Sequence, residues 1–174
     1  MKLFCRAFTV LELVIVVVIV AILVAIALPV LSLFRARAQR IQCMANLRNL
    51  YLSADQFLHQ NGSWPQIPRT DSESGAEDYA SAWIKALAPF GATEKTWICP
   101  TIQGLSDNPD YLNPENVRID YTPMPFDDKP STPHQWPTFP WFVERGDVHG
   151  NGALIIFTDG SITDARTLVS KTSR

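Results

Sequence analysis

The stretch that decides the fold is residues 13–31, LVIVVVIVAILVAIALPVL, which has no charged side chain. A helix of these 19 residues is about 28 Å long, close to the thickness of the hydrocarbon layer of a membrane. The apolar core of a cleaved secretory signal peptide is shorter and ends at a small-residue cleavage site. Here Arg35, Arg37 and Arg40 follow instead, and the stretch therefore predicts a membrane anchor.

Length and charge limit what the rest of the chain can be. The 174 residues suffice for one domain beside an anchor. From residue 49 onward, 9 Lys and Arg stand against 16 Asp and Glu, a difference of −7. A nucleic-acid-binding face needs the opposite sign to neutralise phosphates, so we expect no nucleic-acid partner.

An amphipathic helix follows the anchor. Apolar side chains recur with helical spacing at Cys43, Leu47, Leu50, Tyr51, Ala54, Phe57 and Leu58. We expect the membrane helix to continue to about Gln60, where Asn61-Gly62 supplies a capping signal. The apolar stripe is too short for a freestanding coiled coil, which indicates a helix packed on a domain.

The second half of the chain predicts short elements. Residues 66–78 form a polar linker, residues 79–88 a short helix ended by Pro89, and residues 97–100 a short strand that ends at a proline. Many of the 13 prolines lie between residues 100 and 140, which favours turns. Residues 153–158 and 161–163 are rich in strand formers around Asp159-Gly160, and we predict a hairpin with both turn residues at positive φ.

Residues 6–14, RAFTVLELV, with Pro29 further on, resemble the N-terminal signature of type IV pilins and type II secretion pseudopilins. The resemblance implies cleavage of a basic leader between Ala7 and Phe8 by a prepilin peptidase, and N-methylation of Phe8. The family usually has glycine where this chain has Ala7. Pro29 corresponds to the family's helix-kinking proline.

Glu12 is a carboxylate at the edge of the apolar run, where a charge in lipid is costly without compensation. One interpretation places it at the headgroups, in contact with water. The resemblance implies another, in which the mature N-terminal amine of one subunit neutralises Glu12 of its neighbour during assembly. The basic residues on both sides of the anchor do not decide its orientation, which rests on the resemblance.

His149 and Asp159-Gly160 are separated by nine residues. With Cys43, Asn46-Leu47-Arg48 and Cys99-Pro100, this spacing resembles prepilin-like proteins with a C-terminal H-X9-DG domain, and it implies no reaction. An extended chain of ten residues spans roughly 30 Å, so we expect His149 and Asp159 to mark the two ends of one strand. We interpret His149 as a structural polar residue, with a contact between subunits as the alternative.

Two cysteines, Cys43 and Cys99, remain once a leader containing Cys5 is removed. Cys5 has only four residues before it, so a lipid-modified cysteine after an apolar region is not expected. In an oxidising compartment the remaining pair predicts a disulfide that clamps the domain to the helix, with a typical stabilisation of roughly 2–4 kcal/mol. Two buried free thiols are the alternative.

Other chemistry finds little support in the sequence. No Gly-rich phosphate loop follows a strand, and Cys99 with His149 alone is too bare a pair for nucleophilic catalysis, so we expect no catalytic residues and no enzyme. We also expect no metal ligands and no cofactor. Calcium is a weak candidate at the oxygen-rich residues Asp107, Asn108, Asp110, Asn113 and Glu115, because they lack a fixed ligand spacing.

We therefore expect an α+β, pilin-like fold in which a long N-terminal helix packs on a small antiparallel sheet. The expected parts are a leader (1–7), a transmembrane helix (8–34), its amphipathic continuation (35–61) and a periplasmic domain (62–174) that ends in the hairpin. The resemblance implies a single-pass protein of the bacterial inner membrane with a cytoplasmic N-terminus, which can be extracted into a filament. Its partners would be the peptidase and methyltransferase, other pilin or pseudopilin subunits in a homo- or hetero-polymer, and the assembly platform.

The expected function is that of a structural filament subunit, a pseudopilin. The first alternative is a minor pilin or anchored module that binds a ligand through the aromatic stretch from Trp136 to Trp141. The second is an uncleaved signal-anchor protein that never assembles. The abundance of the protein would distinguish a major subunit from a minor one.

Overall fold

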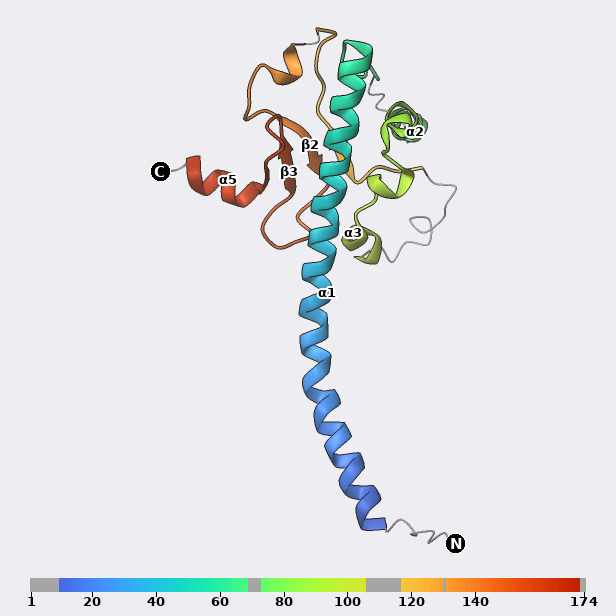
Figure 1. Cartoon of the computed structure of the whole chain (residues 1–174), viewed down its shortest axis with the longest axis vertical. Helices are drawn as coiled ribbons and strands as arrows, with labels where there is room; N and C mark the ends of the chain where they lie inside the picture. The colour runs from blue at the N-terminus through green and yellow to red at the C-terminus, as the bar shows by residue number, and fades with distance from the viewer. Residues whose placement is uncertain (1–9, 69–72, 106–116, 130, 173–174) are drawn as a thin grey trace, which may run out of the picture. The chain divides into compact units, whose positions relative to one another are not determined.

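The computed structural model describes residues 10–68, 73–105, 117–129 and 131–172, which form an α+β fold (Figure 1). The helices are α1 (Val10–Asn61), α2 (Glu73–Leu87), α3 (Pro100–Leu105) and α5 (Ala165–Thr172), with short 3-10 turns at η1 (Ala88–Phe90), η2 (Glu94–Trp97) and η3 (Thr132–His134). The strands are β1 (Tyr121–Pro123), β2 (Pro140–Glu144), β3 (Leu154–Phe157) and β4 (Ile162–Asp164). The expected fold class, a long N-terminal helix with a small antiparallel sheet, is confirmed.

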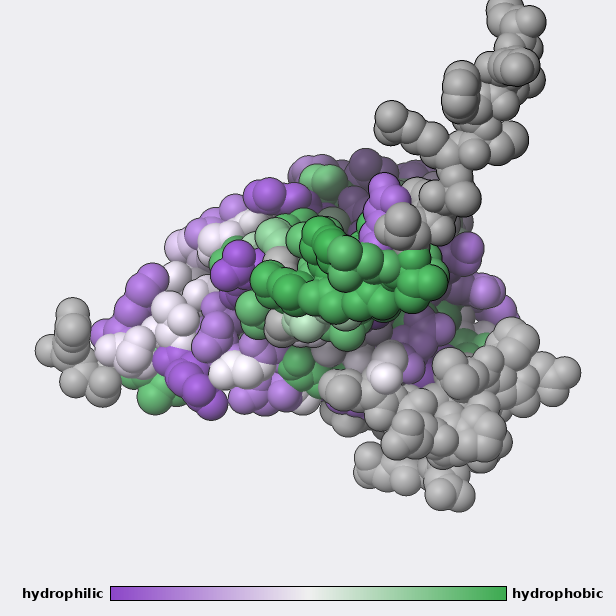
Figure 2. All heavy atoms as spheres, turned by 90° about the horizontal axis from the view of Figure 1, so that it is seen from below, coloured by the Kyte–Doolittle hydropathy of each residue, from purple (hydrophilic) through white to green (hydrophobic). Residues whose placement is uncertain are grey.

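The chain divides into two compact units, Met1–Ala38 and Gln39–Arg174, and α1 contributes to both. In the first unit, the large apolar side chains from Val10 to Phe34 whose surroundings the structure describes are exposed. In Figure 2, which views the molecule from below, the apolar side chains of this part of α1 gather as a green, hydrophobic cluster. Among the helices that the structure describes, one, α1, is both long enough and apolar enough to cross a membrane.

The sheet of the second unit is an antiparallel meander with strand order β1-β2-β3-β4. The pairs Tyr121 with Glu144 and Ile155 with Thr163 fix its register. Between β2 and β3 the register shifts near Pro140, as expected for a proline, which has no N–H for the ladder. This meander places the end of β2 beside the start of β3, where the site described below is formed.

The core of the second unit lies between the sheet and the C-terminal half of α1. The predicted apolar stripe of this helix faces inward: Cys43, Leu47, Leu50 and Ala54 are completely buried, and Tyr51 and Phe57 are partly buried. Burial of each leucine contributes roughly 1.5–3 kcal/mol relative to an exposed one. Tyr51 also donates a hydrogen bond of 2.8 Å to the carbonyl of Thr158. The stripe therefore binds α1 to strands far along the chain.

The helix ends near the predicted residue. Helix α1 stops at Asn61, and Gly62 follows with φ of +72° while its N–H donates to the carbonyl of Leu58. A left-handed glycine after the last turn is a common helix terminator. The predicted helix that ends before Pro89 is also present, but α2 already begins at Glu73, so the expectation of a linker over the whole of 66–78 was wrong.

The C-terminal hairpin is confirmed, but its predicted turn is wrong. Gly160 has φ of +74°, whereas no described non-glycine residue, Asp159 included, has a positive φ. The N–H of Gly160 donates to the carbonyl of Phe157, and the N–H of Phe157 donates to Ser161. This pattern is a three-residue loop with glycine in the left-handed position. Helix α5, which the sequence analysis did not predict, follows β4 directly.

Candidate functional site

Cys43 and Cys99, 56 residues apart in sequence, meet inside the second unit. Cys43 lies on the buried face of α1, and its Sγ atom is 2.6 Å from Sγ of Cys99. Both residues are completely buried, and both are unbonded thiols in this structure. The expected proximity is therefore present, whereas the disulfide itself stays a prediction.

Cys99 is held by a helix start and not by the predicted strand. Trp97 ends the 3-10 turn η2, and Pro100 begins α3. Proline suits the first position of a helix, where no intrahelical partner for its missing N–H is required. The carbonyl of Cys99 accepts the N–H of Gln103, which is a helical hydrogen bond. The prediction that this proline ends a strand was wrong because it begins a helix.

Asp120 fixes the backbone of Cys99 from the other side. Its Oδ2 atom accepts the N–H of Cys99 at 2.8 Å, and its own N–H donates to the carbonyl of Trp97 at 2.8 Å. Arg118 lies 3.4 Å from Oδ1 of Asp120. Burial raises the pKa of the Asp120 carboxyl, although the Cys99 N–H and Arg118 act in the opposite direction. This pairing fixes the position of the Cys99 thiol.

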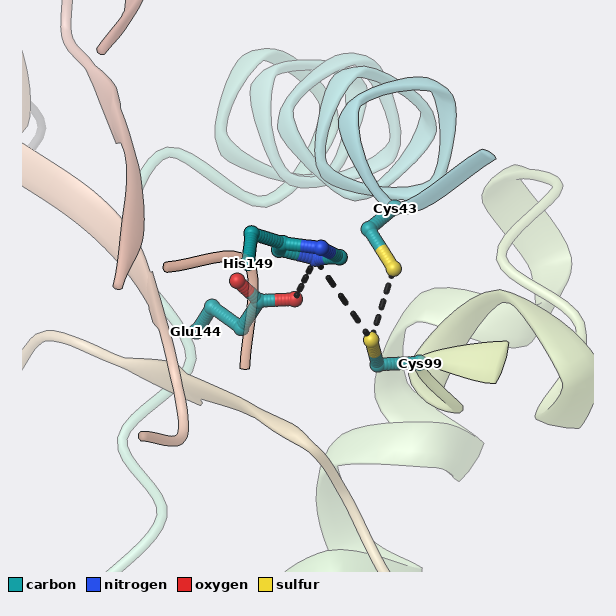
Figure 3. A group of neighbouring side chains, drawn as sticks. All are labelled: Cys43, Cys99, Glu144 and His149. Atoms are coloured by element: carbon teal, nitrogen blue, oxygen red, sulfur yellow. Dashed lines mark hydrogen bonds and ion pairs between the residues drawn. The ribbon is translucent and has the colours of Figure 1, made fainter. Parts of the chain in front are cut away.

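Glu144 and His149 complete a cluster of four side chains (Figure 3). Glu144 is the last residue of β2, and its Oε2 atom accepts the N–H of Leu154, the first residue of β3, at 3.2 Å. Its Oε1 atom is 3.1 Å from Nε2 of His149, which the loop between β2 and β3 carries. The side chains of Glu144 and His149 are 0% and 3% exposed. The side chain of His149 is therefore buried in the cluster, and the expected contact between subunits stays a prediction.

The cluster brings two sulfurs, one imidazole and one carboxylate into a small volume. Nε2 of His149 lies 4.0 Å from Sγ of Cys99, and one donor atom from each residue can be chosen so that all four lie within 4.8 Å of one another. The hydrogen bond with Cys99 lowers the pKa of Cys43 to about 7, and the same bond together with burial raises the pKa of Cys99.

No family model, curated protein or solved structure matches this chain.

The structure separates the members of the H-X9-DG motif. His149 lies in the loop before β3 and joins the cysteine cluster, whereas Asp159 and Gly160 form the turn after β3. This agrees with the expectation that they flank one strand. Gly160 packs near the Tyr51 ring, to which a Cβ at this position would come within 3.5 Å. His149 therefore lies beside Cys99, whereas Gly160 lies beside Tyr51 of α1.

Glu144 is the member of the cluster that the sequence analysis missed. It follows the apolar strand residues Phe142 and Val143, and its place in sequence resembles that of any charged residue at a strand end. The available signal was an acidic residue five positions before His149. A strand end followed by a short loop can bring two such residues together. Such spacing is common in surface loops, so it carries little information without the structure.

Other predicted sites have different outcomes. Ala7 and Phe8 lie outside the described residues, as do the candidate calcium ligands within 106–116. Glu12 is in the first turn of α1 and Pro29 is inside this helix, so the predictions of assembly and of a kink stay predictions. The aromatic stretch proposed as a ligand-binding surface is divided: Trp136 is 49% exposed, whereas Trp141 is completely buried and donates to the carbonyl of Pro133.

Proposed function

We propose that the chain is a structural subunit, a pseudopilin, of a type II secretion-like or type IV pilus-like filament. The observation that carries the proposal is the contrast along α1. Its first half presents exposed apolar side chains, and its second half buries an apolar stripe against the sheet of its own unit. An apolar helix surface of this size requires lipid or other apolar helices around it.

In a filament subunit, the exposed apolar half of α1 is covered first by lipid and later by the helices of other subunits. While it waits in the membrane, the first half of α1 lies in lipid; after assembly, the same surface packs against the corresponding helices of other subunits. The second half of α1 stays covered by the globular unit throughout. A plain membrane anchor accounts for the lipid-exposed half alone, and the N-terminal sequence favours the filament over the anchor.

The proposal assigns roles to residues at the N-terminus. A prepilin peptidase cuts between Ala7 and Phe8, and Phe8 is then methylated. The new amine of one subunit pairs with Glu12 of a neighbour at similar depth, which removes the cost of a lone carboxylate in an apolar surrounding. In this arrangement the N-terminus is cytoplasmic and the second unit is periplasmic.

N-terminal sequencing of the mature protein tests the processing step. We expect the sequence to begin with a methylated Phe8. An intact Met1 in protein recovered from its own membrane would refute processing, and the uncleaved signal-anchor protein would then be the better description.

The assembly step is tested with Glu12→Ala, which should leave expression and membrane insertion unchanged while lowering recovery in sheared filaments. Glu94→Ala is a matched control, because Glu94 is an exposed carboxylate of the second unit. Normal incorporation of Glu12→Ala, or equal loss in both variants, would contradict the assigned role.

A further inference from the structure

We propose that Cys43, Cys99, His149 and Glu144 form a structural Zn²⁺ site that joins α1 to the sheet of the second unit. The sequence analysis expected no metal ligands. The fold brings them together from four segments: α1, the residue before α3, the end of β2 and the loop after it. This inference does not rest on the proposed filament function.

The donor set decides the class of metal. Two thiolates, one imidazole and one carboxylate are ligands of zinc, whereas calcium and magnesium prefer sites made of oxygen alone. Four protein ligands also match the closed tetrahedral coordination of a structural zinc site, as opposed to a catalytic site that keeps a position for water. The complete burial of both cysteines agrees with a closed site.

The size of the cluster is close to what tetrahedral coordination requires. Zinc–ligand distances of 2.0–2.3 Å place two sulfurs roughly 3.8 Å apart, and nitrogen and oxygen roughly 3.3 Å apart. The observed separations are 3.1 Å between Nε2 of His149 and Oε1 of Glu144, and 4.0 Å between the same Nε2 atom and Sγ of Cys99. The two sulfurs, at 2.6 Å, would have to separate by about 1.2 Å. Rotation about the Cα–Cβ bonds of the two cysteines supplies a movement of this size.

Charge gives an independent reason for a cation here. The carboxylate of Glu144 is completely shielded from water, and a buried carboxylate is costly without a compensating charge. It contacts the Leu154 N–H, the His149 ring and the Cys99 thiol. A divalent cation bound here would displace the two thiol protons, because the cysteines bind zinc as thiolates and the histidine binds as neutral imidazole. Its two positive charges would offset two of the three anionic ligands, so the net charge of the site would be −1.

Zinc binding and disulfide formation are mutually exclusive uses of the same two sulfurs. A Cys43–Cys99 disulfide needs neither the histidine nor the carboxylate, yet both side chains are buried against the sulfurs. The zinc site uses all four. The two alternatives therefore make opposite predictions for His149. As a zinc ligand, His149 is required for metal binding; as a neighbour of a disulfide, it is not required for the bond to form.

The test uses the full chain in detergent micelles, reduced, stripped of metal with a chelator and kept under argon. Titration with Co²⁺ as a spectroscopic probe should saturate at one equivalent, with the visible bands of tetrahedral cobalt and a near-ultraviolet thiolate band that has the intensity of two thiolates. Zn²⁺ should then displace the cobalt. Removal of a direct ligand in Cys43→Ser or His149→Gln should weaken binding roughly 100-fold or more, since loss of mere supporting residues already costs 10–100-fold.

His59→Gln is the matched control for His149→Gln, because His59 is an exposed histidine of α1. This variant should bind cobalt like the unchanged chain. If Cys43→Ser does not fold, the thiolate band of the unchanged chain still distinguishes two sulfur ligands from one.

Two results would overturn the proposal. One is the absence of a saturable cobalt spectrum, or a spectrum that His149→Gln leaves unchanged. The other is protein isolated from its own membrane without reductant that contains a Cys43–Cys99 disulfide and no zinc. Stoichiometric zinc in that preparation, with both thiols alkylated only after chelation, would support the site.

Discussion

One guanidinium nitrogen of Arg40 lies 2.8 Å from both carboxylate oxygens of Asp164. The two residues are 124 positions apart in sequence, and the pair connects α1 to the last residue of β4. In the sequence, Arg40 stands with Arg35 and Arg37 directly after the predicted membrane anchor. In the structure it belongs to the second unit, where it has a partner inside the protein.

We expect Arg40→Ala to lower the free energy of unfolding of the second unit by about 1 kcal/mol. This is the upper range for a partly exposed ion pair and reflects its two oxygen contacts. A double-mutant cycle with Asp164→Asn, measured by thermal unfolding in detergent, isolates the pair. Coupling that is indistinguishable from zero, or that does not decrease with added salt, would contradict a contribution from this contact.

The apolar stripe of α1 is tested by two leucines only two positions apart. Leu50 is completely buried, whereas Leu52 is 50% exposed. Leu50→Ala should cost roughly 2–5 kcal/mol, because it removes transfer free energy and leaves a cavity. Leu52→Ala should change stability by less than about 0.5 kcal/mol. Equal losses would mean that the buried face of the helix is assigned wrongly.

Gly160 is expected to resist substitution for two reasons, its φ of +74° and its approach to the Tyr51 ring. Gly160→Ala should destabilise the second unit by about 1–2 kcal/mol, the cost of a left-handed residue with a Cβ. Gly104→Ala is the control, since Gly104 lies inside α3 and an added Cβ would meet only the end of the Gln39 side chain, at 3.9 Å. Chemical denaturation should find this control neutral, or stabilised by up to about 1 kcal/mol.

Tyr51 gives a prediction that depends on pH. Burial raises the pKa of its hydroxyl above the usual 10.0, so the folded protein holds this proton more tightly than the unfolded chain does. The contribution is complete below pH 10 and is lost as the pH rises through the raised pKa. Tyr51→Phe should therefore be less stable than the unchanged chain by about 1 kcal/mol at pH 7, through loss of the hydrogen bond to Thr158.

The difference between the Tyr51→Phe variant and the unchanged chain should then shrink above pH 10. A difference that stays constant up to pH 11 would argue against the shifted hydroxyl. Because the other ionisable groups are common to both proteins, the comparison removes their contributions.

Local signals in the sequence were sufficient for much of the fold. The apolar stripe predicted which face of α1 is buried, Gly62 marked the end of this helix, and the Asp159-Gly160 pair located the last hairpin. Each of these features depends on residues close together in the chain. Errors arose where one residue type serves two structures: Pro100 begins a helix as readily as it ends a strand.

The candidate site was harder to predict, because it depends on how distant segments meet. Cys43 and Cys99 could be paired from the cysteine count alone, once Cys5 was assigned to the leader. Glu144 and His149 join them only because β2 lies next to β3 in the meander, with the loop between them folded back over α1. No periodicity in the sequence carries that information.

The contacts between α1 and the C-terminal strands also determine when this chain can fold during its synthesis. Tyr51 meets its partner Thr158 107 residues later. At 5–20 residues per second, a ribosome needs about 5–20 s to make that length of chain. Throughout this interval the apolar stripe of α1 has no strands to cover it, and an uncovered stripe of this kind is a binding surface for chaperones and a starting point for aggregation. The newly made helix is therefore complete well before its own globular unit can close around it.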